Sequence, residues 1–172
     1  MEDILLKKDI KIISPRYFNL GQNILFLFKK GISQRAGIIP YVIENGKYHL
    51  LLGEKKQNKK LTDFGGGCKN YETPLVCGFR EFQEETKNAF DIDLANITHV
   101  VVTGKKRLHS IIMMVKMENT GNEEYDFFRI PHNKNDELST IEWIAGDQIK
   151  QYNRMEFDDG LRSFIDLFGS YL

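Results

Sequence analysis

The sequence lacks any apolar run long enough to cross a membrane, because a spanning helix needs roughly 18 or more consecutive apolar residues. The first residues, MEDILLKKDIKII, are charged and lack the long apolar core of a signal peptide. We therefore expect a cytoplasmic protein with no membrane partner. Its length of 172 residues is enough for one domain with a real core, so residues 1–172 are predicted to form a single domain.

A net charge is also lacking, because 24 Lys and Arg residues balance 24 Asp and Glu residues. No overall field therefore draws the protein toward nucleic acid or a membrane. Short basic clusters occur at residues 29–30, 55–60 and 105–107. Each cluster taken alone is typical of a solvated loop.

Cysteine is scarce, and the two residues present are Cys68 and Cys77. A turn and a helix start lie between them, and this spacing does not decide whether they form a disulfide. Because disulfides are rare in intracellular proteins, we expect reduced thiols. The histidines, which are His49, His99, His109 and His132, show no metal-ligand spacing.

Carboxylates, in contrast, are concentrated after Thr73 and Pro74, which are good residues for a helix N-cap and first position. A helix from there to Lys87 is amphipathic at about 100° per residue. Its expected apolar face carries Leu75, Val76, Phe79, Phe82 and Thr86. The opposite face carries Glu81, Glu84 and Glu85.

The three glutamates are three or four residues apart, so their carboxylates converge and repel one another on a bare helix. A bound Mg²⁺ or Mn²⁺ reverses this repulsion, since both ions prefer carboxylate oxygen. Cys77 and Gly78 are expected on the same side, where they would leave room for a phosphate. An ordinary solvated face is the alternative, and the glycines and Glu72 ahead of the helix argue against it.

The stretch from Gly66 to Asn88 resembles the Nudix box, GX5EX7REUXEEXGU, in which U is a bulky apolar residue. It matches the box at Gly66, Glu72, Arg80, Glu81, Phe82, Glu84 and Glu85. It departs at the last two positions, where Lys87 replaces the glycine and Asn88 replaces the apolar residue. Because Asn tolerates a left-handed conformation, we expect the helix cap to shift to Asn88, with Ala89 and Phe90 supplying the apolar contact.

The resemblance implies a hydrolase of nucleoside diphosphates linked to another moiety, with Mg²⁺ or Mn²⁺ as cofactor. Its implied metal ligands are the Gly66 carbonyl, Glu81, Glu84 and Glu85. Arg80 would pair with Glu84 and with Glu72, which would tie the loop to the helix. Paired metal ions would neutralise the pyrophosphate and lower the pKa of the attacking water.

The general base stays open between residues of the helix and residues of a later acidic loop. The helix offers Glu81 or Glu85, and the loop offers Glu123, Glu124 or Asp126. We favour Glu124 as an accessory ligand or base. The predicted catalytic residues are therefore Glu81, Glu85, Arg80 and Glu124.

The substrate is the least determined feature, because the downstream signatures of the ADP-ribose, diadenosine polyphosphate and coenzyme A subfamilies are absent. A basic turn with Lys105, Lys106 and Arg107 stands there instead and suits extra phosphates or an RNA backbone. Phe127, with Phe128, or Trp143 would stack a base. We expect a small nucleotide substrate, with capped RNA as the runner-up. An inositol diphosphate would use the same lysines, so charge alone does not exclude it. A non-catalytic nucleotide sensor is the alternative to an enzyme.

The remaining pattern predicts mixed α/β structure. Strands are expected at residues 23–28, 36–42, 47–52, 98–102, 110–117 and 140–144, and helices at 147–152 and from Asp158 or Asp159 onward. Glu44, Asn45 and Gly46 predict a hairpin turn. This agrees with the α/β/α sandwich that the Nudix resemblance implies, a mixed sheet with the box helix and the C-terminal helices packed on it. Residues 1–20 have no clear family counterpart and are an extra strand, a lid or a contact of a homodimer.

Overall fold

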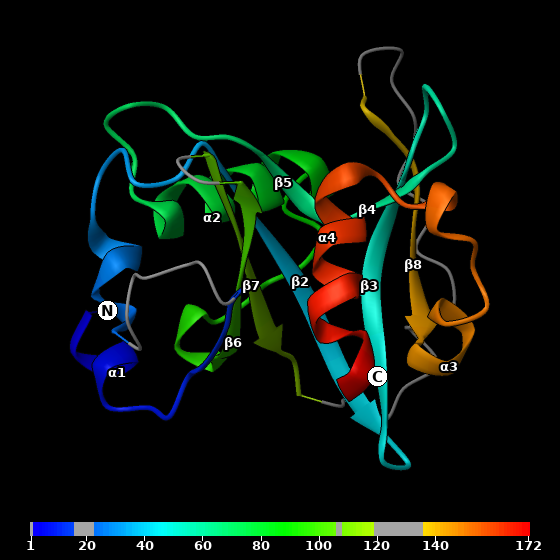
Figure 1. Cartoon of the computed structure of the whole chain (residues 1–172), viewed down its shortest axis with the longest axis horizontal. Coiled ribbons are helices and arrows are strands. Elements are labelled where there is room, and N and C mark those ends of the chain that lie inside the picture. The colour runs from blue at the N-terminus through cyan, green and yellow to red at the C-terminus, as the bar shows by residue number, and fades with distance from the viewer. Residues whose placement is uncertain (1, 16–22, 106–107, 119–135) are drawn as a thin grey trace.

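The computed structural model describes residues 2–15, 23–105, 108–118 and 136–172. Figure 1 shows a twisted sheet with helix α2 behind it and helix α4 in front. The strands are β1 (Lys11–Ile13), β2 (Arg35–Glu44), β3 (Lys47–Lys55), β4 (Leu61–Thr62), β5 (Phe64–Gly67), β6 (Ile97–Lys105), β7 (Leu108–Lys116) and β8 (Leu138–Ala145). The helices are α1 (Glu2–Leu6), α2 (Pro74–Thr86), α3 (Gly146–Ile149) and α4 (Asp159–Phe168). Short 3-10 turns are η1 (Ile24–Phe28), η2 (Leu94–Asn96), η4 (Arg154–Glu156) and η5 (Gly169–Tyr171).

The sheet is mixed and, among the described residues, has eight strands in the order β1-β6-β7-β2-β3-β4. Strand β5 pairs with β2, and β8 pairs with β3. The β1–β6 and β2–β7 pairs are parallel, and the other pairs are antiparallel. Strand β2 is the centre of this arrangement because its first half pairs with β5 and its second half with β3.

Side chains that alternate along the central strands fill a core on each face of the sheet. Ile38, Val100 and Met113 belong to the core under α2, and their neighbours Ile39, Val101 and Met114 belong to the core under α4. On the α4 side, the rings of Phe164 and Phe168 are stacked with centroids 5.2 Å apart. The predicted α/β/α arrangement is therefore confirmed.

Turn and cap residues correctly predicted where several helices and strands begin or end. The hairpin between β2 and β3 turns at Asn45 and Gly46, both with positive φ (50° and 76°), as an Asn-Gly turn requires. The Asp158 side chain accepts a hydrogen bond from the Leu161 amide and caps α4, as predicted.

The expectation of a strand at residues 23–28 is wrong, because Ile24–Phe28 forms the 3-10 turn η1. The Asn23 side chain accepts a hydrogen bond from the Leu25 amide and starts this turn. Phe26 and Leu27 are buried in this turn. A short apolar run can be buried either as a helical turn or as a strand, so the run alone does not distinguish the two.

The N-terminal segment supplies an edge strand, since β1 pairs in parallel with β6. Of the three alternatives for residues 1–20, the described part thus takes the form of an extra strand preceded by helix α1. None of the helices in the described residues has both the length and the apolar character to cross a membrane.

Candidate active site

Helix α2 begins as the sequence predicts and packs against the sheet through small residues. The Thr73 hydroxyl accepts a hydrogen bond from the Val76 amide, and Pro74 opens the helix. A Cβ at Gly78 would come within 2.6 Å of the Met113 Cε atom and 3.5 Å of the Gly37 backbone. Gly78 therefore permits close approach of helix and sheet, and the expectation that it clears space for a phosphate is wrong.

The buried face of α2 is rotated from the predicted one. Val76, assigned to the apolar face, is 53% exposed, whereas Cys77 and Gly78 are buried together with Leu75 and Phe82. The Phe82 ring packs edge-on against Phe64, with centroids 5.4 Å apart. The buried face was predicted wrongly because it was assigned from hydrophobic side chains. Gly78 has no side chain, yet it lies in the face that contacts the sheet.

Cys68 and Cys77 form a disulfide across the loop between β5 and α2, with Cα atoms 5.3 Å apart. The prediction of reduced thiols is wrong. The loop folds back on itself because the Glu72 carboxylate accepts a hydrogen bond from the Lys69 amide, 2.9 Å away. This return brings the first turn of the helix beside the end of β5.

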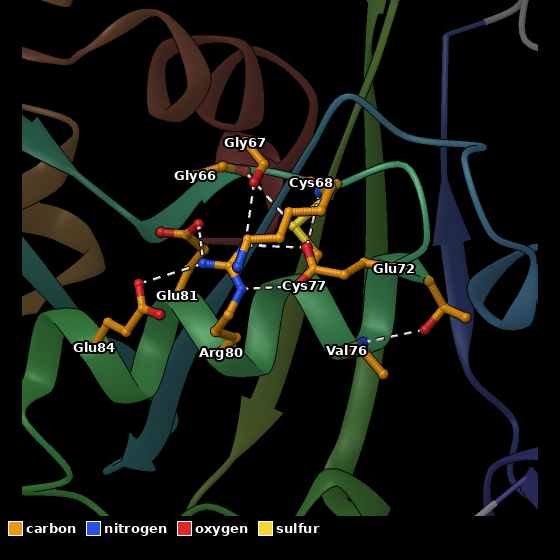
Figure 2. Close-up of polar contacts among 11 residues, drawn as sticks. Gly66, Gly67, Cys68, Glu72, Val76, Cys77, Arg80, Glu81 and Glu84 are labelled. Carbon is orange, nitrogen blue, oxygen red and sulfur yellow. Dashed lines mark hydrogen bonds and ion pairs between the residues drawn. A yellow bond between two sulfur atoms is a disulfide. The ribbon is translucent and has the colours of Figure 1, made fainter.

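Arg80 lies at the centre of a network of ion pairs, drawn in Figure 2. Its Nε atom donates to Glu72 Oε1 at 2.7 Å, and its Nη2 atom donates to Glu72 Oε2 at 3.0 Å. The Nη1 atom donates to Glu81 at 2.6 Å and to Glu84 at 3.3 Å. The predicted pairing of Arg80 with Glu72 and Glu84 is thus present, and Arg80 also donates to the Gly67 carbonyl at 3.2 Å.

Glu72 is the buried member of this network, with 4% of its surface exposed. The hydrogen bonds from Arg80 are the main reason that its pKa falls to about 2, and the Lys69 amide contributes further. Glu72 is therefore a permanent anion that fixes Arg80 and the loop together, which is the structural role that the sequence predicts.

Gly66 and Glu81 lie in direct contact. A Cβ at position 66 would collide with both carboxylate oxygens of Glu81, so any other residue there would displace this side chain. The antiparallel pairing of β5 with β2 places Gly66 opposite Ala36, directly beside the helix. The geometry thus brings Gly66 and Glu81, two of the residues predicted to hold the metal, side by side.

Glu85 has a different environment from Glu72. Its Oε2 atom is buried and has no hydrogen-bond partner among the described residues. Burial, and then the negative charges of Asp63, Glu137 and Glu81, raise the pKa of Glu85 to about 9, while Arg35 opposes the shift. Without a cation, this carboxyl group is therefore protonated at neutral pH.

Asp63 and Arg35 carry charges that act on Glu85, and neither is among the site residues predicted from the sequence. Asp63 is fully buried and forms a bidentate ion pair with Arg35, at 2.8 and 2.9 Å. A Cβ at Gly37 would collide with the Asp63 carboxylate, and a Cβ at Gly65 would come within 2.5 Å of the Gly37 Cα atom and 3.0 Å of the same carboxylate. In the sequence, Asp63 could have been recognised as a site residue by its position two residues before the glycine run 65–67.

A pocket of about 210 Å³ lies between the end of α2 and the start of β8. Its lining residues are Glu81, Glu84, Glu85, Lys87, Asp136, Glu137, Leu138, Ser139, Thr140 and Ile141. The three glutamates of the box therefore face one space together, as predicted. Glu137, which directly precedes β8, is a further carboxylate there that the sequence did not single out.

The donor set suits a hard divalent cation, because it consists of carboxylate oxygens with a backbone carbonyl nearby. The unpartnered oxygen of Glu85 and the contact of Glu81 with Gly66 both fit such an ion. In the described part of the chain, no three Asp, Glu, His or Cys side chains are yet close enough to hold one ion. Arg80 pairs with Glu81 and Glu84 instead, and the Glu84 side chain is 60% exposed.

The box helix ends at Lys87, which adopts the left-handed conformation with φ 53° and ψ 37°. Asn88 also has positive φ, 56°, and its amide donates to the Gln83 carbonyl at 3.0 Å. The left-handed conformation expected at Asn88 is therefore present, but the cap itself does not shift, since Lys87 also adopts the conformation that glycine favours and is the cap residue. Phe90 packs against the core, as predicted for the displaced apolar contact.

Several predicted site residues lie outside the described residues. These are Glu124, with Glu123 and Asp126, and Lys106, Arg107, Phe127 and Phe128. Lys105 is the last residue of β6, and its side chain is also outside the description. Trp143 is half-buried and packs against the core under α2.

Comparison with solved structures identifies this fold. RenU, a Nudix hydrolase from M. smegmatis, matches with a TM-score of 0.54 and 15% identity, over 79% of this chain and 84% of that chain. A Listeria monocytogenes protein described as a Nudix hydrolase matches with a TM-score of 0.54 and 12% identity, over 79% and 91% of the two chains. No family model matches the sequence, and no curated protein matches it. The chain therefore has the Nudix hydrolase fold, as its box predicts.

Proposed function

We propose that the protein is a metal-dependent Nudix hydrolase that cleaves a pyrophosphate bond in a nucleoside diphosphate linked to another moiety. The observation that carries this proposal is the pocket at the end of α2, where Glu81, Glu84 and Glu85 meet on a Nudix fold. One oxygen of Glu85 is buried there, and no hydrogen-bond donor from the described part of the chain reaches it. Such a group is costly to a fold unless a ligand satisfies it.

Mg²⁺ or Mn²⁺ would be held by the Gly66 carbonyl, Glu81, Glu84 and Glu85. When bound, the ion supplies charge neutralisation for the pyrophosphate and lowers the pKa of water. The rigid back of α2, packed through Gly78 and Phe82, keeps these side chains on a fixed surface. Rigid support of this kind is what a catalytic constellation requires.

The residues around the ligands have separate tasks in this proposal. Arg80 orients Glu81 and Glu84, and Glu72 holds Arg80 in place. The proton acceptor is one of the pocket carboxylates Glu81 and Glu85, or the predicted accessory residue Glu124. Glu137 joins these candidates because it lines the same pocket.

A small nucleotide remains the proposed substrate, and capped RNA remains the runner-up. Lys105, Lys106, Arg107 and Phe127 are the proposed substrate-binding residues, on the grounds of their charge and aromatic character alone. Homodimer formation and a cytoplasmic location also remain predictions.

The proposal is tested by incubating the purified protein with Mn²⁺ or Mg²⁺ and a panel of nucleoside triphosphates, dinucleotides, nucleotide sugars and capped RNA. Release of phosphate or nucleoside monophosphate, dependent on the ion and absent in Glu85→Gln, is the expected result. Absence of turnover across the whole panel would favour a non-catalytic nucleotide sensor.

A further inference from the structure

Lys87 occupies the position where the Nudix box has glycine, and its conformation is the one that glycine favours. A left-handed conformation costs an L-residue about 1–2 kcal/mol, whereas glycine adopts it without strain. The Lys87 ammonium lies 2.6 Å from the Asp136 carboxylate, and both side chains are mostly shielded, at 35% and 22% exposure. The cap thus places a charged side chain in the lining of the pocket that α2 forms with β8.

Asp136 is followed directly by Glu137, so the ion pair also restrains Glu137. The Glu137 carbonyl accepts a hydrogen bond from the Lys56 amide at 2.8 Å, which fixes the backbone against the end of β3. The ion pair with Lys87 adds a restraint from the side of α2. Glu137 lies in the same pocket as Glu85, close enough that its charge acts on Glu85.

We propose that Lys87 is a positioning residue, which holds Asp136 and thereby sets the Glu137 carboxylate against the box glutamates as part of the metal-binding set. This inference rests on the proposed function, because it concerns the same ion. Lys87, which stands where the Nudix box has glycine, thereby has a role in the site. The ion pair links two elements far apart in the sequence, the end of the box helix and the start of β8.

A purely electrostatic role for Lys87 makes a different prediction about metal binding. Removing a positive charge near a cation site strengthens cation binding, and removing a negative charge weakens it. If charge alone mattered, loss of Lys87 and loss of the Asp136 charge would shift Mn²⁺ affinity in opposite directions. If the ion pair positions Glu137, both losses weaken binding, because each releases the same restraint.

The test is isothermal titration of Mn²⁺ into the substrate-free protein. Lys87→Gly suits the left-handed backbone and removes the ammonium, and Asp136→Asn removes its partner. A charge-swapped double variant, Lys87→Asp with Asp136→Lys, restores the pair in the opposite sense, and Asp is tolerated in this conformation. Lys150→Met, at an exposed lysine after α3, is the control for a simple change in net charge.

We expect each single variant to bind Mn²⁺ about 10-fold more weakly, in the range found for residues that support metal ligands. The double variant should return to within about 3-fold of the wild-type protein, and Lys150→Met should not differ from it. Opposite shifts in the two single variants, unchanged affinity in both, or no recovery in the double variant would overturn the positioning role. A wild-type protein that binds no Mn²⁺ would instead contradict the proposed function itself, and the positioning role would fall with it.

Discussion

The two halves of helix α2 carry charge in opposite ways. In the first half and the loop before it, Glu72 and Arg80 satisfy each other through two hydrogen bonds, and the pKa of Glu72 falls to about 2. In the second half, Glu85 is buried beside other carboxylates, and its pKa rises to about 9. The charge of Glu72 is compensated within the protein, whereas Glu85 would be a stable anion only with a cation bound.

This difference separates residues that stabilise the fold from residues that hold a ligand, although both kinds belong to one sequence motif. Removing one partner of a buried ion pair destabilises a fold, whereas removing an unpaired buried carboxyl group relieves a cost of burial. Glu72 and Glu85 should therefore respond to the same substitution, Glu to Gln, in opposite ways. The variants below test that contrast.

Glu85→Gln should have the largest effect on activity. Turnover should fall by at least about 100-fold, as for loss of a group that acts in the chemical step. In the absence of metal, the free energy of unfolding at neutral pH should stay unchanged or rise slightly, because the buried Glu85 carboxyl group, with its pKa raised to about 9, must take up a proton on folding and Gln needs none. Steady-state rates and urea unfolding of the same preparation measure both quantities.

Glu44→Gln provides a matched control, since Glu44 is the last residue of β2, at the other end of the strand from the pairing with Gly66. It should change neither quantity. A Glu85→Gln protein that unfolds readily but keeps its specific activity would contradict the assignment of Glu85 to the site.

Glu72→Gln should mainly lower stability, by roughly 2–4 kcal/mol, because it leaves Arg80 without its buried partner. The pKa of Glu72 lies below its ordinary value of 4.5, so its stabilising effect is fully present above about pH 4.5 and disappears as the pH falls toward 2. The stability difference between the variant and the wild-type protein should therefore be large at pH 7 and small near pH 2.5. Urea unfolding at several pH values measures it, and a loss of activity without any destabilisation would show that Glu72 belongs to the site instead.

Cys68→Ser should lower stability by about 2.5 kcal/mol, because the disulfide to Cys77 closes a short loop and restricts the unfolded chain. Cys68 is the better residue to change, since Cys77 is fully buried. A reducing agent should destabilise the wild-type protein by a similar amount and leave the variant unchanged. Equal sensitivity of both proteins to the reducing agent would show that the bond does not contribute in solution.

Lys87→Gly should have the smallest effect on stability, a gain of about 0.5–1 kcal/mol. The gain comes from relief of the left-handed strain, offset by the lost ion pair and the greater freedom of glycine in the unfolded chain. Thermal unfolding at low ionic strength measures it. A loss of stability in this variant would mean that the ion pair with Asp136 outweighs the strain.

Features set by neighbouring residues were predictable from the sequence. Thr73 and Pro74 begin α2, Asn45 and Gly46 make the hairpin, and Asp158 caps α4, because caps and turns depend on a few adjacent groups. The spacing of the box glutamates also predicted correctly that they share one face and one pocket.

Features set by pairing between distant segments were not predictable. The buried face of α2 depends on the contact of Gly78 with Met113, which lies on β7. The approach of Glu137 to Glu85 depends on the pairing of β8 with β3, and the burial of Asp63 depends on Arg35. No local periodicity carries this information, so the helix phase and the additional pocket carboxylates emerged only from the three-dimensional structure.

The most direct test of the central claim is the effect of Mn²⁺ on the thermal unfolding of the wild-type, Glu85→Gln and Glu72→Gln proteins. Binding to the folded state alone stabilises it in proportion to RT ln(1 + [L]/Kd). We predict that Mn²⁺ raises the unfolding temperature of the wild-type protein and of Glu72→Gln, which starts from a lower value, and has little effect on Glu85→Gln. An equal increase in Glu85→Gln and the wild-type protein would contradict the assignment of the second half of α2 to the metal site.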